Sequence, residues 1–296
     1  MGNRRSRKRR SMLYIPGNNA AMIQQGGVYG ADCILLDLED SIAPGEKDAA
    51  RILLKHMIPS VNFYGAEVVV RVNHPDTPFG HDDLREIVPI QPDALRLPKI
   101  ESADDVLRTI RLIEEIESAH GLPHDRLTVH AMIETAVGVE NALSIAKASP
   151  RISSVTIGGQ DLAADMGISL EKNSRGLDYA SQRIVMAAKA ARIEAMDTVF
   201  VDVDDEEGLR EAARHAKEMG FTGKAAINPR QIEVINEVFT PTEQEITRAI
   251  DVVSAYNRHK AAGVGVFALH GKMVDAPVVA RALHVLDLAD IDPETL

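Results

Sequence analysis

The chain alternates between short apolar segments and amphipathic segments, and it does so eight times. The apolar segments are rich in β-branched residues and nearly continuous, which is typical of parallel strands that are buried on both faces. The segments between them repeat apolar residues at spacings of three and four, which is typical of covering helices. The predicted strands are 11–17, 32–40, 68–73, 94–100, 127–135, 153–161, 196–203 and 223–229.

The number of these units predicts the fold class. Eight strand–helix units between residues 11 and 240 match the size of a (β/α)8 TIM barrel, an α/β fold. The alternative is an open, doubly wound sheet, which normally has a glycine-rich phosphate-binding turn after its first strand. The corresponding sequence here, YIPGNNAAM, does not match such a turn. We therefore predict a barrel over residues 11–240.

The two ends of the chain differ from the barrel. The first ten residues, MGNRRSRKRR, include six basic residues and no acidic ones. We predict that residues 1–10 form a flexible basic arm, for which targeting, binding of a polyanion or contact with ligand phosphates are alternative roles. Residues 241–296 predict a helix, a strand-like stretch and a last helix. Since a barrel needs no ninth unit, this C-terminal extension is expected to be a lid or an oligomerisation element.

The composition excludes several classes of protein. The formal net charge is -11, and without the basic arm the chain has 27 basic residues (33 minus 6) against 44 acidic ones, which does not suit a general nucleic-acid binder. A single cysteine, Cys33, excludes an internal disulfide and fits a reducing compartment. No apolar run reaches the roughly 18 residues of a membrane span, and the N-terminus lacks the apolar stretch of a secretory signal. We expect a cytoplasmic protein without a nucleic-acid or membrane partner.

Nearly every predicted strand ends in a polar residue. In a barrel, the C-terminal ends of the strands meet at one face, the mouth, where the connecting loops build the active site. The segment LLDLEDSIAP places Asp37, Glu39 and Asp40 directly after a buried strand. Because unpaired carboxylates rarely tolerate burial, we expect these three to be solvated or paired with cations at the mouth. The other polar strand ends are Arg71, Asn73, Lys99, Glu134, Gln160, Asp161, Asp202 and Asn228.

Two of these acids suggest a metal site. Glu134 and Asp161 are 27 residues apart, about one strand–helix unit, so they are expected to end neighbouring strands whose tips lie roughly 5 Å apart. Carboxylate oxygens and water are the usual ligands of Mg²⁺, although each acid alone is also compatible with a helix cap or a surface carboxylate. Arg71 adds a guanidinium that can bind a substrate carboxylate in a bidentate manner. A metal and an arginine together suit chemistry that creates an oxyanion or an enolate.

Other residues and motifs give weaker indications of a functional site. His130 lies within LTVHAMI and is expected to be a hydrogen-bonded core histidine. Asp275, within HGKMVDAPVV, can be an N-cap with Pro277 in the first helical turn. The sequence contains no HExxH, paired CxxC, Walker or GxSxG motif, so zinc, P-loop and nucleophile-elbow chemistry have no support.

Several motifs, in order along the chain, resemble those of the citrate lyase β chains. These chains belong to a wider HpcH/HpaI aldolase-like family with the malyl-CoA and citramalyl-CoA lyases. The resemblance runs from about residue 9 to about residue 290, and it implies a (β/α)8 barrel that uses Mg²⁺ and assembles as a homotrimer or homohexamer. The motifs are RRSMLYIPGNNAAM, YGAD, DLEDS with EKDAAR, VVVRVNHPDTPFG, LRLPKIE, INPRQI and GKMVDAPVV.

The resemblance also implies roles for individual residues. The family arginine that binds the oxo-acid carboxylate matches Arg71, and the glutamate that binds metal and substrate matches Glu134. The metal-binding aspartate matches Asp161. In the malyl-CoA lyase branch, an aspartate of the C-terminal segment completes the site of a neighbouring subunit as acid/base, and Asp275 matches it.

Three more residues are expected to support this site from behind. Asp37 and Glu39 are predicted to hold metal-bound water, and Lys99 ends a strand at the same face. Thr135 and Gln160 stand where citrate lyase β chains usually have serine and glutamate, in IES and GAED. Both lie beside the predicted metal ligands, so they leave the choice of substrate open.

The predicted function is that of a Mg²⁺-dependent carbon–carbon lyase. It would cleave a (3S)-citryl thioester of CoA or of an acyl-carrier protein to oxaloacetate and an acetyl thioester by retro-Claisen chemistry. The first alternative is a malyl-CoA or citramalyl-CoA lyase, or the reverse condensation. The second is a non-catalytic scaffold subunit of a lyase complex. Citrate lyase α and γ (acyl-carrier) subunits are possible partners.

Overall fold

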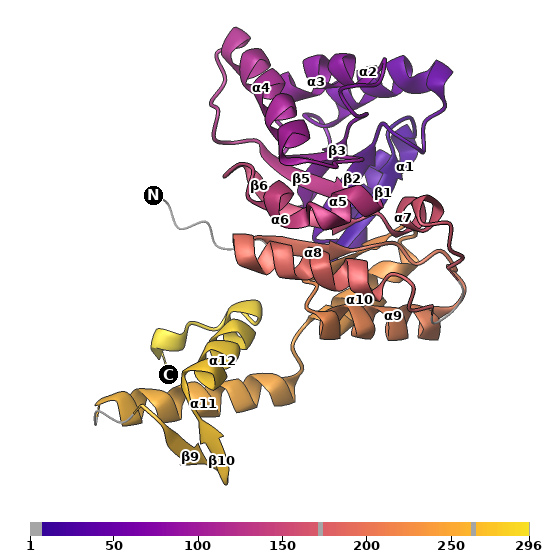
Figure 1. The fold of residues 1–296 in the computed structure, drawn as a ribbon. Helices are drawn as coiled ribbons and strands as arrows, with labels where there is room; N and C mark the ends of the chain where they lie inside the picture. Colours follow the sequence, from indigo (N-terminus) through magenta and orange to yellow (C-terminus); the bar gives the residue numbers. More distant parts are fainter. Residues whose placement is uncertain (1–7, 171–173, 262–264, 296) are drawn as a thin grey trace. The chain divides into compact units, whose positions relative to one another are not determined.

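Eight parallel strands form a closed barrel in the computed structural model, which describes residues 8–170, 174–261 and 265–295 (Figure 1). The strands pair in the order of the sequence, and β1 also pairs with β8. This closure confirms the predicted (β/α)8 barrel and excludes the open, doubly wound sheet. The strands are β1 (Ser11–Pro16), β2 (Cys33–Asp37), β3 (Glu67–Arg71), β4 (Ala94–Leu97), β5 (Thr128–Ile133), β6 (Ile152–Ile157), β7 (Glu194–Asp197) and β8 (Gly223–Ala226).

Helices connect successive strands. The longer ones follow the predicted amphipathic segments, and α4 begins with a capping box in which Ser102 and Asp105 bond each other's main-chain amides. The helices of this part are α1 (Ala20–Gln25), α2 (Lys47–Met57), α3 (Gly80–Ile87), α4 (Ala103–Ala119), α5 (Ala136–Glu140), α6 (Ala142–Ala146), α7 (Gly159–Asp165), α8 (Asp178–Ala191), α9 (Glu206–Met219) and α10 (Arg230–Phe239). The short 3-10 helices are η1 (Gly26–Tyr29), η2 (Pro44–Glu46) and η3 (Val88–Ile90).

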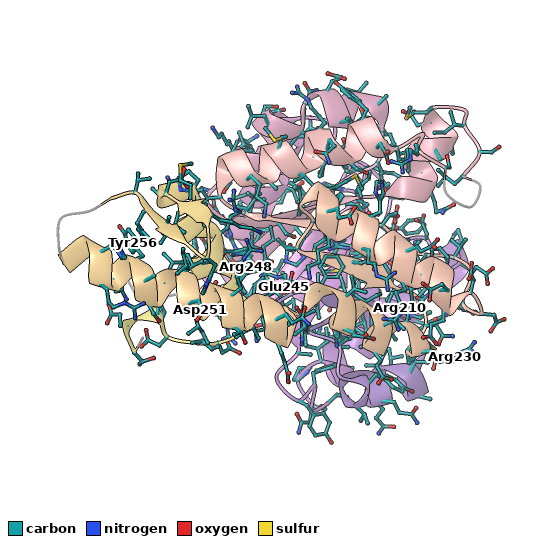
Figure 2. All side chains as sticks on the ribbon, turned by 90° about the horizontal axis from the view of Figure 1, so that it is seen from below. Arg210, Arg230, Glu245, Arg248, Asp251 and Tyr256 are labelled. Atoms are coloured by element: carbon teal, nitrogen blue, oxygen red, sulfur yellow. The ribbon has the colours of Figure 1, made fainter. Side chains whose placement is uncertain are left out.

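The outward sides of the helices are charged. Figure 2 labels Arg210 on α9 and Arg230 on α10. Arg210 pairs with Glu237 at 2.8 Å, and Arg230 pairs with Asp204 at 3.0 Å. Ion pairs on a protein surface contribute little to stability. Here they indicate that these helix faces are exposed to solvent.

Strand β7 is the one place where the predicted elements differ clearly from the structure. A strand was expected over 196–203, whereas β7 spans Glu194–Asp197 and a loop follows. The side chain of Asp197 pairs with Lys224 Nζ at 2.6 Å, and the carbonyl of Thr198 accepts a second bond from the same amine. These contacts end the strand against β8. Asp202 is therefore an exposed loop residue and not a strand end.

The barrel interior is apolar in the middle and ionic near its N-terminal end. Arg9 donates to Glu67 at 2.6 Å and also pairs with Glu194, while Arg10 pairs with Asp32 at 2.8 Å. Two residues of the expected flexible arm thus belong to the barrel, where they pair with buried Glu67 of β3 and half-buried Glu194 of β7 and Asp32. Residues 1–7 lie outside the described part of the chain. The apolar layer consists of Met12, Cys33, Leu35, Val69, Ala94 and Met196, with Tyr14 packed against it.

The C-terminal extension belongs to a second compact unit, whose described residues are Lys8, 238–261 and 265–295. Figure 2 labels Glu245, Arg248, Asp251 and Tyr256 along its long helix α11. The predicted strand-like stretch is a short antiparallel hairpin, since His270 and Gly271 adopt left-handed backbone and reverse the chain. The elements are α11 (Glu243–Ala261), β9 (Phe267–Leu269), β10 (Lys272–Val274), α12 (Ala276–Leu288) and η4 (Pro293–Thr295).

This second unit has an apolar core of its own. Aliphatic side chains of α11 and α12 supply most of it, and Val274 of the hairpin joins them. Among the residues that the structure describes, no helix combines the length and the apolar character that crossing a bilayer requires. The core residues are Ala249, Val252, Val253, Val274, Val279, Ala282 and Leu286.

Candidate active site

Arg71 lies at the C-terminal end of β3 and is held by a carboxylate of the neighbouring strand. Its Nε and Nη2 donate to the two oxygens of Asp37 at 2.6 and 2.7 Å. Both side chains are almost completely buried. Asp37 and Arg71 are paired in the register of β2 and β3, so the sheet itself places them side by side. Such a two-bond contact fixes the orientation of the guanidinium.

Two further carboxylates occupy the remaining edge of Arg71. Nη1 lies 2.8 Å from Oε2 of Glu39 and 3.3 Å from Oδ2 of Asp40. On the other side, Lys99 Nζ donates to Oε1 of Glu39 at 2.8 Å and lies 3.8 Å from Asp40. The acidic segment after β2 is therefore paired with two cations, Arg71 on β3 and Lys99 in the segment after β4. This pairing explains how its carboxylates can be buried.

Burial and pairing act in opposite directions on these acids. Burial alone would raise the pKa of Asp37, but the bonds from Arg71 outweigh it and hold the pKa below its ordinary value. Burial raises the pKa of Glu39 above its ordinary value, although Arg71 and Lys99 oppose this shift and the neighbouring Asp40 adds to it. Asp37 is thus a fixed negative charge, whereas Glu39 is the acid whose ionisation responds to its surroundings.

The loop that carries Glu39 is held in place by the side chains of Lys47 and Asn73. Lys47 Nζ donates to the carbonyls of Leu38 and Glu39, both at 2.9 Å. Asn73 Nδ2 donates to the same Leu38 carbonyl and to buried Asp83. Asn73, which we had placed among the polar strand ends, therefore supports the loop. The only sequence signal for Lys47 is its place in the EKDAAR motif.

Glu134 follows β5 and is 1% exposed. Its Oε1 accepts a hydrogen bond from the main-chain N–H of Lys99 at 2.7 Å, whereas Oε2 has no partner within the described part of the chain. Gly158 lets this side chain pack directly against the backbone, since a Cβ there would lie 2.3 Å from Oε2 and 2.6 Å from the Cβ of Glu134. Burial, and then the negative charges of Asp161 and Glu39, raise the pKa of Glu134 to about 8.

Asp161 lies in the first turn of α7, directly after β6. Strands β5 and β6 are neighbours in the barrel, so Glu134 and Asp161 follow adjacent strands. After burial, the charge of Asp161 is the next cause of the raised pKa of Glu134. Thr135 caps α5 by accepting a bond from Gly138 N–H at 3.2 Å, and Gln160 is exposed. Thr135 therefore has a local structural role beside the site.

The residues present fit a divalent cation that prefers oxygen. One buried carboxylate oxygen at the mouth, Oε2 of Glu134, accepts no hydrogen bond from any described residue, whereas Oε2 of Glu39 is already paired with Arg71 at 2.8 Å. Unsatisfied buried acceptors are costly, and a cation or its bound water would satisfy them. Across the described residues, no group of three or more histidine, cysteine or acidic side chains forms a complete metal site. One or two carboxylates, completed by water and substrate, are the typical protein ligands of Mg²⁺.

Tyr14 and Arg96 form the floor beneath this network, and sequence reasoning missed both. The Arg71 guanidinium lies 5.3 Å from the centre of the Tyr14 ring, and Arg96 donates to the Tyr14 hydroxyl at 2.9 Å. Arg96 is fully buried. An interior arginine on a strand gives no signal in the hydrophobic pattern, because the strand around it still reads as apolar.

Asp275 and His130, the two residues that we set apart from the strand ends, each have a defined local environment. Asp275 belongs to the second compact unit, where it caps α12 by accepting a bond from Val278 N–H at 3.1 Å. His130 is fully buried in the barrel, as expected, and burial lowers its pKa well below the ordinary value. The expected hydrogen bonds of His130 are not found among the described residues, although Nε2 lies 3.8 Å from Oε1 of Glu67.

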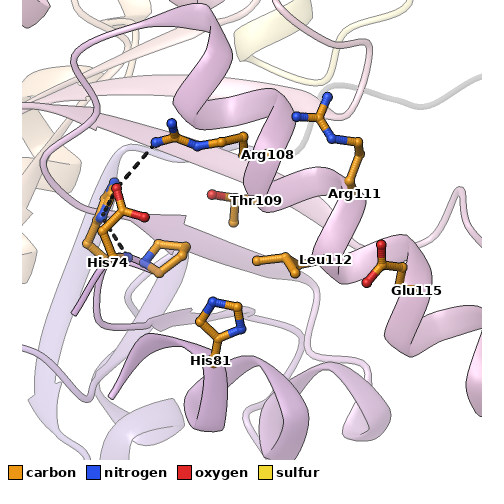
Figure 3. Close-up of a pocket in the computed structure, with 9 residues that line it drawn as sticks. His74, His81, Arg108, Thr109, Arg111, Leu112 and Glu115 are labelled. Atoms are coloured by element: carbon orange, nitrogen blue, oxygen red, sulfur yellow. Dashed lines mark hydrogen bonds and ion pairs between the residues drawn. The ribbon is translucent and has the colours of Figure 1, made fainter. Parts of the chain in front are cut away.

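A separate pocket lies between the loop after β3 and helix α4 (Figure 3). In it, Arg108 pairs with Asp76 at 3.3 Å, and His74 Nδ1 lies 3.8 Å from the same carboxylate. None of the predicted site residues lines this pocket, so it is distinct from the network at the mouth. Its lining residues are His74, Pro75, Asp76, His81, Arg108, Thr109, Arg111, Leu112 and Glu115.

The closed barrel with charged groups at its mouth defines the class of α/β-barrel enzymes. The family described as HpcH/HpaI aldolase/citrate lyase matches residues 10–229. The chain is 42% identical to citrate lyase subunit beta of Leuconostoc mesenteroides subsp. cremoris over 96% of this chain and 94% of that protein. It is 33% identical to the mitochondrial citramalyl-CoA lyase of Mus musculus, over 95% of this chain and 86% of that one.

A solved structure agrees with these relatives. The citrate lyase β subunit from M. tuberculosis, complexed with oxaloacetate and magnesium, superposes with a TM-score of 0.68 at 30% identity, over 81% of this chain and 100% of that one. The chain belongs to the HpcH/HpaI aldolase/citrate lyase family. It is a carbon–carbon lyase.

Proposed function

We propose that the chain cleaves a (3S)-citryl thioester to oxaloacetate and an acetyl thioester in a Mg²⁺-dependent reaction. The observation that carries this proposal is the buried Glu134, whose Oε2 has no hydrogen-bond partner among the described residues and whose pKa is raised by burial and by the charge of Asp161. Glu134 and Asp161 would hold the metal ion. The magnesium and oxaloacetate in the related M. tuberculosis structure support the same assignment.

The reaction breaks a bond between two carbons, so charge and protons must be moved. The substrate hydroxyl loses its proton, the electron pair of the carbon–carbon bond moves to the α carbon of the thioester, and that carbon then takes up a proton. When bound, Mg²⁺ supplies positive charge that stabilises the negative charge developing on the oxo-acid half. Arg71 would bind the carboxylate of this half through the edge that Glu39 and Asp40 now face.

Asp275 is our candidate for the group that transfers the proton of the acetyl half. In this proposal, Asp275 of one subunit completes the barrel mouth of a neighbouring subunit in a homotrimer or homohexamer. Asp37 would keep Arg71 oriented, while Glu39 and Lys99 would hold water next to the site. The buried pair of Asp37 with Arg71 supports the role of Asp37 in orienting Arg71.

The names of the relatives bear on the thioester carrier, which is CoA or an acyl-carrier protein, and on the partner subunits. The name of the Leuconostoc relative, a β subunit, favours a complex with other citrate lyase subunits, such as α and an acyl-carrier γ subunit. The name of the mouse relative favours a CoA thioester. We propose that the chain acts in the cytoplasm, in line with its single cysteine.

A coupled assay tests the proposed function. Purified chain is incubated with citryl-CoA, and oxaloacetate is followed by its reduction with NADH and malate dehydrogenase. We expect oxaloacetate to form with Mg²⁺, to cease with excess EDTA, and to return when Mg²⁺ is added back. A reaction with the citryl thioester that ignores the metal, or no reaction in the presence of the partner subunits, contradicts the proposal.

The second candidate function is cleavage of malyl-CoA or citramalyl-CoA, or the reverse condensation. The similarity to citramalyl-CoA lyase over most of the chain and the variant residues Thr135 and Gln160 favour it. A panel of the three thioesters, with glyoxylate, pyruvate and oxaloacetate as the respective products, separates the candidates. The scaffold function requires that Glu134→Ala and Asp161→Ala chains leave a reconstituted complex fully active.

We predict that Mg²⁺ binding to the metal-free protein releases about one proton at pH 7. Because burial raises the pKa of Glu134 to about 8, this carboxyl is mostly protonated at pH 7, and it must lose its proton to bind a cation. Affinity should therefore rise with pH up to about 8, by as much as about tenfold per unit, and level off above it. Titration calorimetry in buffers of different ionisation enthalpy measures the proton, and an affinity that is constant from pH 6 to pH 9 contradicts the prediction.

A further inference from the structure

Lys99 has an unusual backbone conformation. Its φ is +53°, in the left-handed region that residues with a side chain rarely adopt. Five other described residues with side chains share this region, and each of them lies in a tight turn or at the end of a helix. Lys99 instead follows Pro98 in the segment that leads from β4 into the mouth. Strain of this kind persists where the surrounding structure requires it, and it is frequent at functional sites.

The left-handed conformation lets two consecutive main-chain amides point to different partners. The N–H of Lys99 donates to Oε1 of Glu134 at 2.7 Å. The next amide, of Ile100, donates to the carbonyl of Met132 at 3.1 Å and so continues the pairing of the chain with β5. A residue that cannot adopt a positive φ at position 99 must give up one of these two bonds.

The bond from Lys99 decides which oxygen of Glu134 remains available. Glu134 is buried, and Oε1 is engaged by the amide while Oε2 has no partner in the described residues. Gly158 packs against Oε2, because a Cβ at that position would lie only 2.3 Å from it. A carboxylate that is held at one oxygen presents the other in a fixed direction, which is how hydrogen bonds to ligating side chains orient a metal site.

We propose that Lys99 is a positioning residue whose main-chain N–H, through its left-handed backbone, fixes Glu134 for binding of a divalent cation. This inference rests on the proposed function, because it takes Glu134 as a metal ligand. It assigns the role to the backbone of Lys99 and not to the ammonium group, which bonds Glu39.

The test compares substitutions that differ in their tolerance of a positive φ and that all lack the ammonium group. Glycine adopts the left-handed region freely and asparagine tolerates it, whereas a β-branched valine does not. The dissociation constant for Mn²⁺ alone, measured on the full chain by electron paramagnetic resonance, is the readout. We expect Lys99→Gly and Lys99→Asn to bind Mn²⁺ alike, and Lys99→Val to bind it about 10–100-fold more weakly than Lys99→Gly.

A matched pair of variants separates this effect from general stability. Arg192 has φ +58° at the C-terminal end of α8, directly before β7 and therefore at the face of the barrel opposite the mouth. Arg192→Gly and Arg192→Val should differ in Tm but not in Mn²⁺ affinity. Should Lys99→Val not fold, Lys99→Ala takes its place, with a smaller loss in the same direction expected.

The outcomes distinguish the two proposals. Equal Mn²⁺ affinity of the glycine and valine variants at position 99, or an equal affinity difference between the Arg192 variants, overturns the role of Lys99. If the wild-type chain does not bind Mn²⁺, or if Glu134→Gln binds it as well as wild type does, the metal site of the proposed function fails instead.

Discussion

Replacing Arg71 with methionine is expected to lower the free energy of unfolding by about 3–5 kcal/mol. The substitution keeps much of the side-chain volume but leaves Asp37, which is 1% exposed, without its cation. Glu39 loses one of its two counter-charges in the same step. Removing one partner of a buried pair costs far more than the pair contributes, because the remaining charge stays desolvated. Urea unfolding of the two chains at pH 7 measures the difference.

A double variant and a surface variant serve as controls. Adding Asp37→Asn to Arg71→Met removes the uncompensated charge, so we expect it to restore a large part of the lost stability. Arg111→Met, at an exposed arginine of α4, should change stability by no more than about 0.5 kcal/mol. A loss for Arg71→Met as small as that for Arg111→Met would show that the mouth is better hydrated than its burial indicates.

The same pair has a defined pH dependence. In the folded protein, the bonds from Arg71 overcome burial and hold the pKa of Asp37 below its ordinary value. The stabilisation is therefore fully present above the unfolded pKa of about 4, and it is lost as the pH falls through the folded value. The difference in stability between wild type and Arg71→Met should accordingly shrink in acid.

Asp37 already accepts two hydrogen bonds from Arg71, and this limits how Arg71 can bind a substrate. From the sequence, we expected its guanidinium to bind a substrate carboxylate with two hydrogen bonds. In the structure, Nε and Nη2 already make such a contact with Asp37, so a substrate carboxylate has to approach the Nη1 edge. Glu39 and Asp40 lie on that edge and must yield to it. The acidic segment thus both orients Arg71 and competes for it.

The sequence was sufficient to predict the barrel and several of the charged residues at its mouth. Eight apolar runs with polar ends can be buried and satisfied together only when the ends meet at one face, and Asp37, Arg71 and Glu134 do meet there. The register of neighbouring strands then determines that Asp37 lies beside Arg71. These features follow from periodicity and from the need to pair buried charges, both of which are local properties of the sequence.

The features that could not be predicted depend on tertiary contacts. The left-handed backbone of Lys99 has no signature in LRLPKIE, because nothing in the motif requires a positive φ. Strand β7 ends early because Lys224 on β8 binds Asp197, a contact between residues 27 positions apart. The end of β7 is determined by its contact with β8, and not by the apolar residues that follow it in the sequence.

Asp275 is the residue for which local geometry says least about function. It caps α12, and the same geometry is found at Asp205, whose Oδ1 accepts a bond from Gly208 N–H at 3.0 Å at the start of α9. Asparagine caps a helix about as well as aspartate does. A purely structural role therefore predicts that Asp275→Asn and Asp205→Asn are both nearly neutral.

We expect Asp275→Asn to fold, assemble and bind Mg²⁺ like wild type, yet to lose turnover by roughly 10²–10⁴-fold, the usual cost of removing a general acid/base. An amide cannot take up or release a proton in the required pH range, although it preserves the cap. Asp205→Asn is the matched control, and its kcat should stay at the wild-type value. Steady-state kinetics with the thioester that proves best in the panel measures both, and a fully active Asp275→Asn chain would make this residue a cap and nothing more.

Mixing two inactive chains tests whether Asp275 acts on a neighbouring subunit. Asp161→Asn is the better partner for this experiment, since Arg71 variants are expected to be destabilised while Asp161 is only half-buried. If the site is shared, mixed oligomers combine an intact mouth from the Asp275→Asn chain with an intact Asp275 from the other chain, in about a quarter of the sites under random assembly. Activity should then return on mixing with subunit exchange. Oligomers that exchange subunits but stay inactive would place Asp275 at the mouth of its own barrel.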